Sequence, residues 1–155
     1  MRTFLLALGL AALSAPALAC TCSAPESDAQ KREIAARIAN ESIAIVDVEQ
    51  VAAMDFKAMR GETYSVAKVH IGKAPARIEL ARAFHRDPNG EVSLGMTSCD
   101  EIPPPGRRTT VVLYATETPG KFRFGYTCDQ YFLNEVPGAI EHVRAAWRQR
   151  PAERG

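Results

Sequence analysis

The sequence predicts a small, mainly β domain that folds as a closed five-stranded barrel with a short helix at each end. Segments rich in β-branched and aromatic residues recur in short succession between turn residues, at 42–51, 62–71, 76–84, 109–115 and 121–128. Helical spacing of apolar residues is confined to the two ends of the chain. Closing the five strands into a barrel would remove exposed strand edges, which otherwise invite aggregation.

Residues 1–19 have the composition of a secretory signal peptide. Arg2 supplies the positive start, an apolar run of about ten residues covers 4–13, and an A-x-A cleavage site ends at Ala19. The run is too short to span a membrane, which takes about 20 apolar residues. We therefore expect cleavage after Ala19 and a secreted or periplasmic protein that begins at Cys20. A lipoprotein that carries its lipid anchor on Cys20 is the alternative.

The rest of the chain suits one domain at 20–150, followed by a flexible tail at 151–155. Arg2 is the one charged residue of 1–19, so the remainder carries 18 basic and 18 acidic side chains. No long run of one charge sign occurs, and nothing therefore indicates binding to nucleic acid or to an anionic membrane. A protein or a small molecule is the expected partner.

The first helix is expected at 28–39. The segment "SDAQ" (27–30) before it has the form of a capping box, and apolar residues then recur at helical spacing. In the strand at 42–51 the apolar phase slips between Ile45 and Val46, which predicts a bulge.

Turn residues separate the later elements. "GKAP" (72–75) is a short connection between the strands at 62–71 and 76–84. The segments 85–91 and 101–108 are expected to form an exposed turn and a stiff proline loop.

The second half should hold a strand at 109–115 that is buried on both faces, and another at 121–128. The last helix should begin near Pro137, with Trp147 as a core anchor. Alternate residues of 121–128 share one face, which we expect to line the core: Phe122, Phe124, Tyr126 and Cys128.

The segment "AAMDFKAMRG" (52–61) contains three large apolar residues, Met54, Phe56 and Met59. A short helical turn packed on the core is the expected arrangement. An exposed apolar contact patch is the alternative.

All four cysteines lie in the exported part of the chain: Cys20, Cys22, Cys99 and Cys128. An even number in an oxidising compartment predicts two disulfides. A bridge between Cys20 and Cys22 would close a very tight ring of poor geometry. The two other pairings stay open, and both tie the N-terminus to distant sites. Each closes loops of roughly 80 to 110 residues, for which chain entropy gives at most about 4 to 5 kcal/mol.

The sequence gives no support for an enzyme. His70, His85 and His142 are scattered, so we expect neither a metal site of the chain's own nor a cofactor. Nucleophile-elbow, phosphate-loop and dinucleotide motifs are missing from the sequence. A redox-active C-x-C pair is not expected either, because no histidine lies near either cysteine in sequence.

The opening Cys-Thr-Cys (20–22) and the later "VVLYATETPGKFRFGYTC" (111–128) resemble the netrin-like module, most closely the N-terminal domain of tissue inhibitors of metalloproteinases. The resemblance covers most of 20–147. It implies an OB-type five-stranded barrel with helices packed beside it. It also implies the disulfides Cys20–Cys99 and Cys22–Cys128.

In those inhibitors the free α-amine and the carbonyl of the first cysteine chelate the zinc of the protease, and the next residue enters its specificity pocket. The resemblance thus implies that Cys20 chelates a partner's zinc, that Thr21 enters the pocket, and that Cys22 and Ser23 fix the contact ridge. An α-amine has a pKa of about 7.7 to 8, so it readily becomes a nitrogen ligand for zinc. A non-inhibitory periplasmic binding or assembly module is the alternative function.

Overall fold

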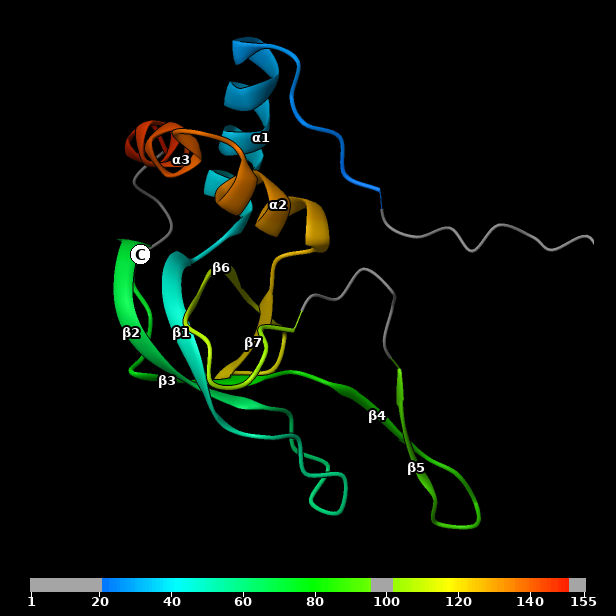
Figure 1. Ribbon diagram of the computed structural model, residues 1–155. Helices are drawn as coiled ribbons and strands as arrows, with labels where there is room; N and C mark the ends of the chain where they lie inside the picture. The colour runs from blue at the N-terminus through cyan, green and yellow to red at the C-terminus, as the bar shows by residue number, and fades with distance from the viewer. Residues whose placement is uncertain (1–20, 96–101, 151–155) are drawn as a thin grey trace, which may run out of the picture.

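Five strands form a closed barrel in the computed structural model, which describes residues 21–95 and 102–150 (Figure 1). Around the barrel the order is β1-β2-β3-β7-β6. All neighbouring pairs are antiparallel except β3 and β7, which run parallel. The strands are β1 (Ala44–Ala52), β2 (Thr63–Gly72), β3 (Arg77–Leu80), β6 (Thr109–Ala115) and β7 (Lys121–Phe124). The predicted mainly β, closed five-stranded barrel with flanking helices is therefore confirmed.

The described residues form three helices, which gather at one end of the barrel in Figure 1: α1 (Asp28–Glu41), α2 (Thr127–Glu135) and α3 (Ala139–Arg148). The helices predicted at 28–39 and after Pro137 are confirmed. α2 was not predicted. No helix of the described part of the chain is long and apolar enough to cross a membrane.

Two apolar clusters stabilise this arrangement. One fills the barrel, and the other lies between the barrel wall and the helices. Adjacent residues of β6 belong to different clusters, Val111 to the barrel interior and Val112 to the helix layer. The prediction that 109–115 is buried on both faces is confirmed for Val111 to Tyr114, whose side chains are all buried.

The phase slip in β1 is also confirmed. Its pairing with β2 shifts register between Ile45 and Val46. Ile45 packs in the helix layer, while Val46 packs inside the barrel. The bulge therefore accompanies a strand that supplies side chains to both clusters.

The predicted strand 76–84 is wrong as a single element. β3 ends at Leu80, and β4 (Ala83–Arg86) leaves the barrel to pair only with β5 (Val92–Gly95). Between β3 and β4 the guanidinium of Arg82 binds the carboxylate of Glu62 through two hydrogen bonds of 2.7 and 3.0 Å, which fixes the chain at the point where it leaves the barrel. The predicted turn 85–91 therefore lies largely at the tip of a hairpin that projects from the barrel in Figure 1.

The predicted strand 121–128 is also too long. β7 ends at Phe124, and α2 begins at Thr127. Tyr126, expected in the core, is 54% exposed, and Cys128 lies in the first turn of α2. Gly125 permits the change of direction, because a Cβ there would meet the Cβ atoms of Asp129 and Val112 at 3.0 and 3.1 Å. Only a residue without a side chain lets α2 approach the barrel this closely.

The connection between β1 and β2 is a tight turn rather than the expected helical turn on the core. The backbones of Asp55 and Arg60 pair across it. Phe56 and Met59 are 48% and 38% exposed, so the alternative of an exposed apolar surface is right for these two side chains. Phe56 touches Phe84 of β4 edge to face, with ring centroids 6.1 Å apart.

Candidate functional site

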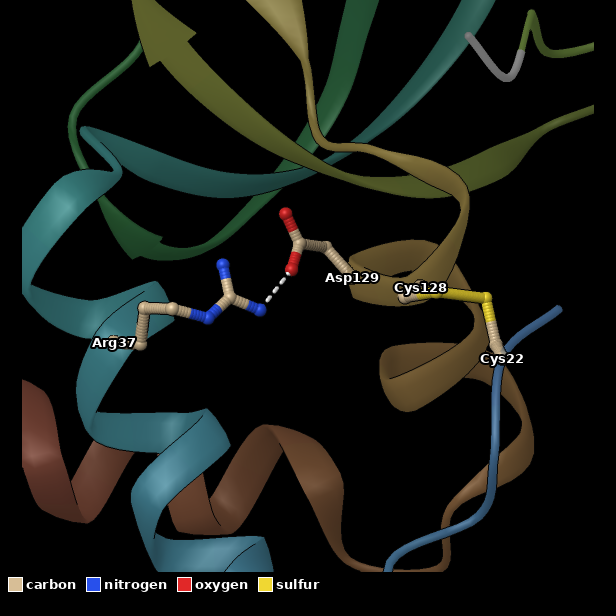
Figure 2. The surroundings of a disulfide bond; sticks show 4 residues. All are labelled: Cys22, Arg37, Cys128 and Asp129. Carbon is tan, nitrogen blue, oxygen red and sulfur yellow. Dashed lines mark hydrogen bonds and ion pairs between the residues drawn. A yellow bond between two sulfur atoms is a disulfide. The ribbon is translucent and has the colours of Figure 1, made fainter. Parts of the chain in front are cut away.

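The N-terminal segment of the described chain is attached to α2 by a disulfide between Cys22 and Cys128, which are 106 residues apart in sequence. Their Cα atoms lie 5.2 Å apart, a usual span for this bond. Figure 2 shows the bond between the extended N-terminal segment and the first turn of α2. The Cys22–Cys128 pairing implied by the resemblance is confirmed. Cys20 and Cys99 lie outside the described residues, so their pairing stays a prediction.

A second restraint holds the same segment at its other end. Ser27 caps α1 by accepting a hydrogen bond from the amide of Gln30 at 3.2 Å. The side chain of Gln30 in turn accepts from the amide of Glu26 at 2.6 Å. The predicted capping box is present, although the amide that it satisfies is that of Glu26 rather than Ser27. Residues between Cys22 and Glu26 are therefore fixed on both sides.

The side chains beside Cys22 face solvent. Thr21 and Ser23 are both exposed, whereas Cys22 is only partly exposed. The resemblance implies that Thr21 enters a specificity pocket and that Cys22 and Ser23 fix the contact ridge. A loose chain end would lose conformational entropy on binding a partner, and the two restraints reduce that cost.

The first turn of α2, to which this segment is attached, is stabilised by a buried carboxylate next to the disulfide. Asp129 is 1% exposed and accepts two hydrogen bonds. Arg37 of α1 donates to Oδ1 at 2.5 Å, as Figure 2 shows, and the hydroxyl of Tyr114 on β6 donates to Oδ2 at 2.9 Å. One carboxylate thus joins α1, α2 and the barrel directly behind Cys128.

Burial and nearby charges in this cluster keep Tyr114 and Arg37 protonated. Burial, and after it the charge of Asp129, raises the pKa of Tyr114, so its hydroxyl remains a donor. Burial alone would lower the pKa of Arg37, but the hydrogen bond to Asp129 and the charge of that carboxylate outweigh it. The net direction for the pKa of Arg37 is upward, so its guanidinium stays charged across the ordinary pH range.

Sequence reasoning missed all three members of this cluster. Arg37 and Asp129 are 92 residues apart, and no local pattern connects them. A signal for α2 was nevertheless present. Asp129, Phe132, Leu133 and Val136 follow the helical spacing i, i+3, i+4, i+7, and all four are buried. The pattern is easily missed because its first member is an aspartate.

A separate polar cluster lies on the barrel wall. The Oδ1 atom of Asp47 is 2.8 Å from Nε2 of His70 and accepts a hydrogen bond from the Thr110 hydroxyl at 2.7 Å. These residue types occur in catalytic triads, but here the imidazole and the hydroxyl share one carboxylate oxygen. In a triad the hydroxyl would donate its hydrogen bond to the histidine, which activates it. Here the Thr110 hydroxyl donates to Asp47 instead.

Within 21–95 and 102–150 no three histidine, cysteine, aspartate or glutamate side chains are grouped so that they could hold a metal ion. What the described site offers is an exposed, doubly restrained stretch of chain on a rigid support. Such a surface suits recognition of a partner.

Comparison with known proteins gives no further guide: no protein family, no curated protein and no solved structure matches this chain.

Proposed function

We propose that the chain is an exported protein-binding module whose contact surface is the N-terminal segment mounted on α2. The observation that carries the proposal is the Cys22–Cys128 disulfide, which holds exposed Thr21 and Ser23 against a buried ionic cluster. A disulfide of this kind persists in oxidising compartments, which agrees with the signal peptide expected at 1–19.

The sharper form of the proposal is inhibition of a zinc metalloprotease. After cleavage behind Ala19, the α-amine and carbonyl of Cys20 chelate the zinc of the protease, and Thr21 enters its specificity pocket. Catalytic zinc sites keep one position open for water, which such a chelate displaces. Support comes from the resemblance of 20–22 and 111–128 to the metalloproteinase inhibitors and from the restraint on the residue that follows Thr21.

The test compares the mature protein with a variant that carries one extra alanine before Cys20. Both are assayed against a panel of zinc endopeptidases with a fluorogenic peptide. The extension moves the amine away from the chelating position, so inhibition should fall by about a hundredfold or more, whereas folding should not change. An alanine added after Gly155 is the matched control and should inhibit like the parent. Equal inhibition by the two extended proteins would remove the amine from the mechanism.

The intact mass of the native protein tests the premise of this mechanism. Cleavage after Ala19 and the loss of four hydrogens are expected, which correspond to a free Cys20 amine and two disulfides. A lipid on Cys20 would instead support the lipoprotein alternative. An acylated amine cannot chelate zinc, so only the binding module would then remain.

A second candidate function is assembly, favoured by exposed apolar side chains near the β1–β2 turn, which lies at the far end of the barrel from the helices in Figure 1. Val51, Phe56 and Met59 are 51%, 48% and 38% exposed near the β1–β2 turn. Self-association through this surface should be weakened by V51S combined with F56S. V69S, which alters a side chain of β2 that is 41% exposed, is the control. Light scattering measures the molar mass, and a parent that stays monomeric at all concentrations contradicts assembly.

A further inference from the structure

Arg123 lies on the side of β7 that faces away from the barrel interior, and one of its nitrogens has no polar partner within the described chain. Nη1 of Arg123 is buried and makes no hydrogen bond within the described chain. Buried polar atoms are nearly always hydrogen-bonded, and an unpaired one costs roughly 1 to 3 kcal/mol, with more for a charged group. This donor therefore calls for an explanation.

The guanidinium of Arg123 lies over the rings of two tyrosines. Its Cζ atom lies 4.2 Å from the ring centroid of Tyr114 and 5.1 Å from that of Tyr126. Tyr114 is the cross-strand partner of Arg123 in the β6–β7 pair, which places the two side chains on one face of the sheet. A cation–π contact does not use up the hydrogen-bond donors of a guanidinium, whose N–H groups lie along its edge. The geometry of this fork matches a carboxylate, which it can bind through two parallel hydrogen bonds.

Arg123 borders a cavity of about 420 Å³. The volume is within the usual range for small-ligand sites, about 300 to 1,000 Å³. Its lining includes Ala83 and Tyr126, whose side chains are exposed, and the backbone at Gly95 and Gly125. Leu80 and Phe124 also border it, but their side chains pack inside the barrel. A ligand that fits this lining has an apolar body as well as a charged head.

Among the described residues that line this cavity, Arg123 is the cation without a carboxylate partner. Arg82, the other basic residue of the lining, is bound to the buried carboxylate of Glu62 through two hydrogen bonds. Lys121, which precedes Arg123 by two residues, forms an ion pair with Glu79. Among the described residues no carboxylate forms an ion pair with Arg123, so its positive charge is not compensated there.

We propose that this cavity binds a carboxylate with an apolar body, its oxygens on the edge of Arg123 and its body against Ala83 and Tyr126. The carboxylate belongs either to a free small acid or to the end of a peptide chain. The site borders Tyr126, two residues before Cys128, and so lies beside the mount of the N-terminal segment. It does not depend on protease inhibition, because no part of the argument uses Cys20 or a zinc ion.

The experiment titrates the isotope-labelled mature protein near pH 7 and follows the NMR signals of the Gly95 and Gly125 amides. N-acetyl-leucine is the first probe, and N-acetyl-leucinamide, which lacks the charge, is its matched control. The acid should give saturable shifts at both glycines, and the amide should bind about tenfold more weakly or not at all. A tetrapeptide ending in leucine, with a free or an amidated C-terminus, forms the second arm. Clearly tighter binding of the free tetrapeptide identifies a chain end as the source, and equal binding identifies a small acid.

The variant R123Q should reduce the affinity for N-acetyl-leucine by about tenfold or more. R86Q, which removes one positive charge from an exposed arginine of the projecting hairpin, is its control and should bind like the parent. R123K keeps the charge but loses the fork, so its affinity should fall between those of the parent and R123Q. If R123Q fails to fold, Y126L provides the test. It removes the exposed aromatic ring beside the guanidinium, and its affinity should also fall.

Four results would each overturn the proposal. They are equal binding of the acid and the amide, equal affinity of R123Q and the parent, tighter binding of inorganic phosphate than of N-acetyl-leucine, and no saturable shift at either glycine. An alanine before Cys20 leaves this site unaltered, so loss of inhibition and loss of carboxylate binding can be told apart.

Discussion

At the scale of single residues, carboxylates decide how the polar parts of this protein are held. Asp129 is buried, yet both of its oxygens accept hydrogen bonds, one from a guanidinium and one from a tyrosine hydroxyl. Asp47 receives its two polar contacts at a single oxygen and remains partly accessible, with 17% of its side chain exposed. The buried carboxylate therefore joins three elements, and the shallower one joins three neighbouring strands.

Asp47 should make the stability of the protein depend on pH. Burial would raise the pKa of this carboxyl, but the hydrogen bonds from Thr110 and His70 outweigh it and hold the pKa below its usual value. A lowered pKa in the folded state means that the charged form stabilises the fold above the unfolded pKa of about 3.9. This contribution is lost as the pH falls through the folded value.

We therefore expect D47N to lower the free energy of unfolding by about 1 kcal/mol at pH 6. The difference from the parent should shrink below about pH 3.9, where the carboxyl of the unfolded parent gains a proton before that of the folded parent does. Urea titrations at a series of pH values measure it. T110V removes one of the two partners and should keep only part of the pH dependence. A difference between D47N and the parent that is the same at pH 6 and pH 3 would contradict this assignment.

At the scale of elements, local patterns predicted those parts of the fold that local patterns determine. The capping residues at 27–30 and the apolar spacing behind them located α1, and the phase slip at Ile45 located a real bulge. The strand 121–128 was predicted too long because the alternation of its side chains continues to Cys128. The structure ends β7 at Phe124, and α2 already begins at Thr127.

The remaining errors come from contacts between distant residues. Glu62 binds Arg82 across 20 residues, at the point where the chain leaves the barrel. The predicted strand continued past this point to residue 84, whereas β3 ends at Leu80. The candidate site divides in the same way. Its disulfide followed from a resemblance, but the Arg37–Asp129 pair that supports it spans 92 residues and leaves no trace in either segment.

Gly125 is the point at which the barrel and α2 meet most closely, and G125A should therefore destabilise the protein. An added Cβ would lie 3.0 Å from the Cβ of Asp129 and 3.1 Å from that of Val112, so α2 must move outward. Overpacking of this kind costs about 1 to 3 kcal/mol. G95A is the matched control, because its Cβ would meet Ala83 at an ordinary 3.5 Å.

Denaturant unfolding of both variants measures the difference. Combining G125A with D129N should cost less than the sum of the two single changes, because both loosen α2 from the barrel. Strict additivity would show that the strain at Gly125 does not reach the Asp129 cluster.

At the scale of the whole molecule, the two ends of the barrel differ in character. The helices and the N-terminal segment occupy one end, and the β1–β2 turn and the β4–β5 hairpin extend from the other (Figure 1). The Cys22–Cys128 bond holds the N-terminal segment against this end of the molecule, because it joins the start of the described chain to α2. Without that bond, the segment would lose its attachment to α2, while the capping box at 26–30 would remain.

Replacing both cysteines in the variant C22S/C128S separates these two restraints. It leaves Cys20 and Cys99 as the only cysteines, so no incorrect pairing within the chain can form. Because the lost bond spans 106 residues, the free energy of unfolding should fall by about 2 to 4 kcal/mol, less than the chain-entropy limit.

NMR relaxation then distinguishes a global effect from a local one. The heteronuclear NOE of the amides of 22–24 should fall in C22S/C128S far more than that of the amides in β1 and β6, because the segment can detach while the barrel stays closed. S27A, which removes only the cap, is the companion variant and should loosen the start of α1 without freeing Cys22. If 22–24 stay as rigid in C22S/C128S as in the parent, the disulfide does not hold this segment in place, and the binding surface proposed for this end of the barrel loses its physical basis.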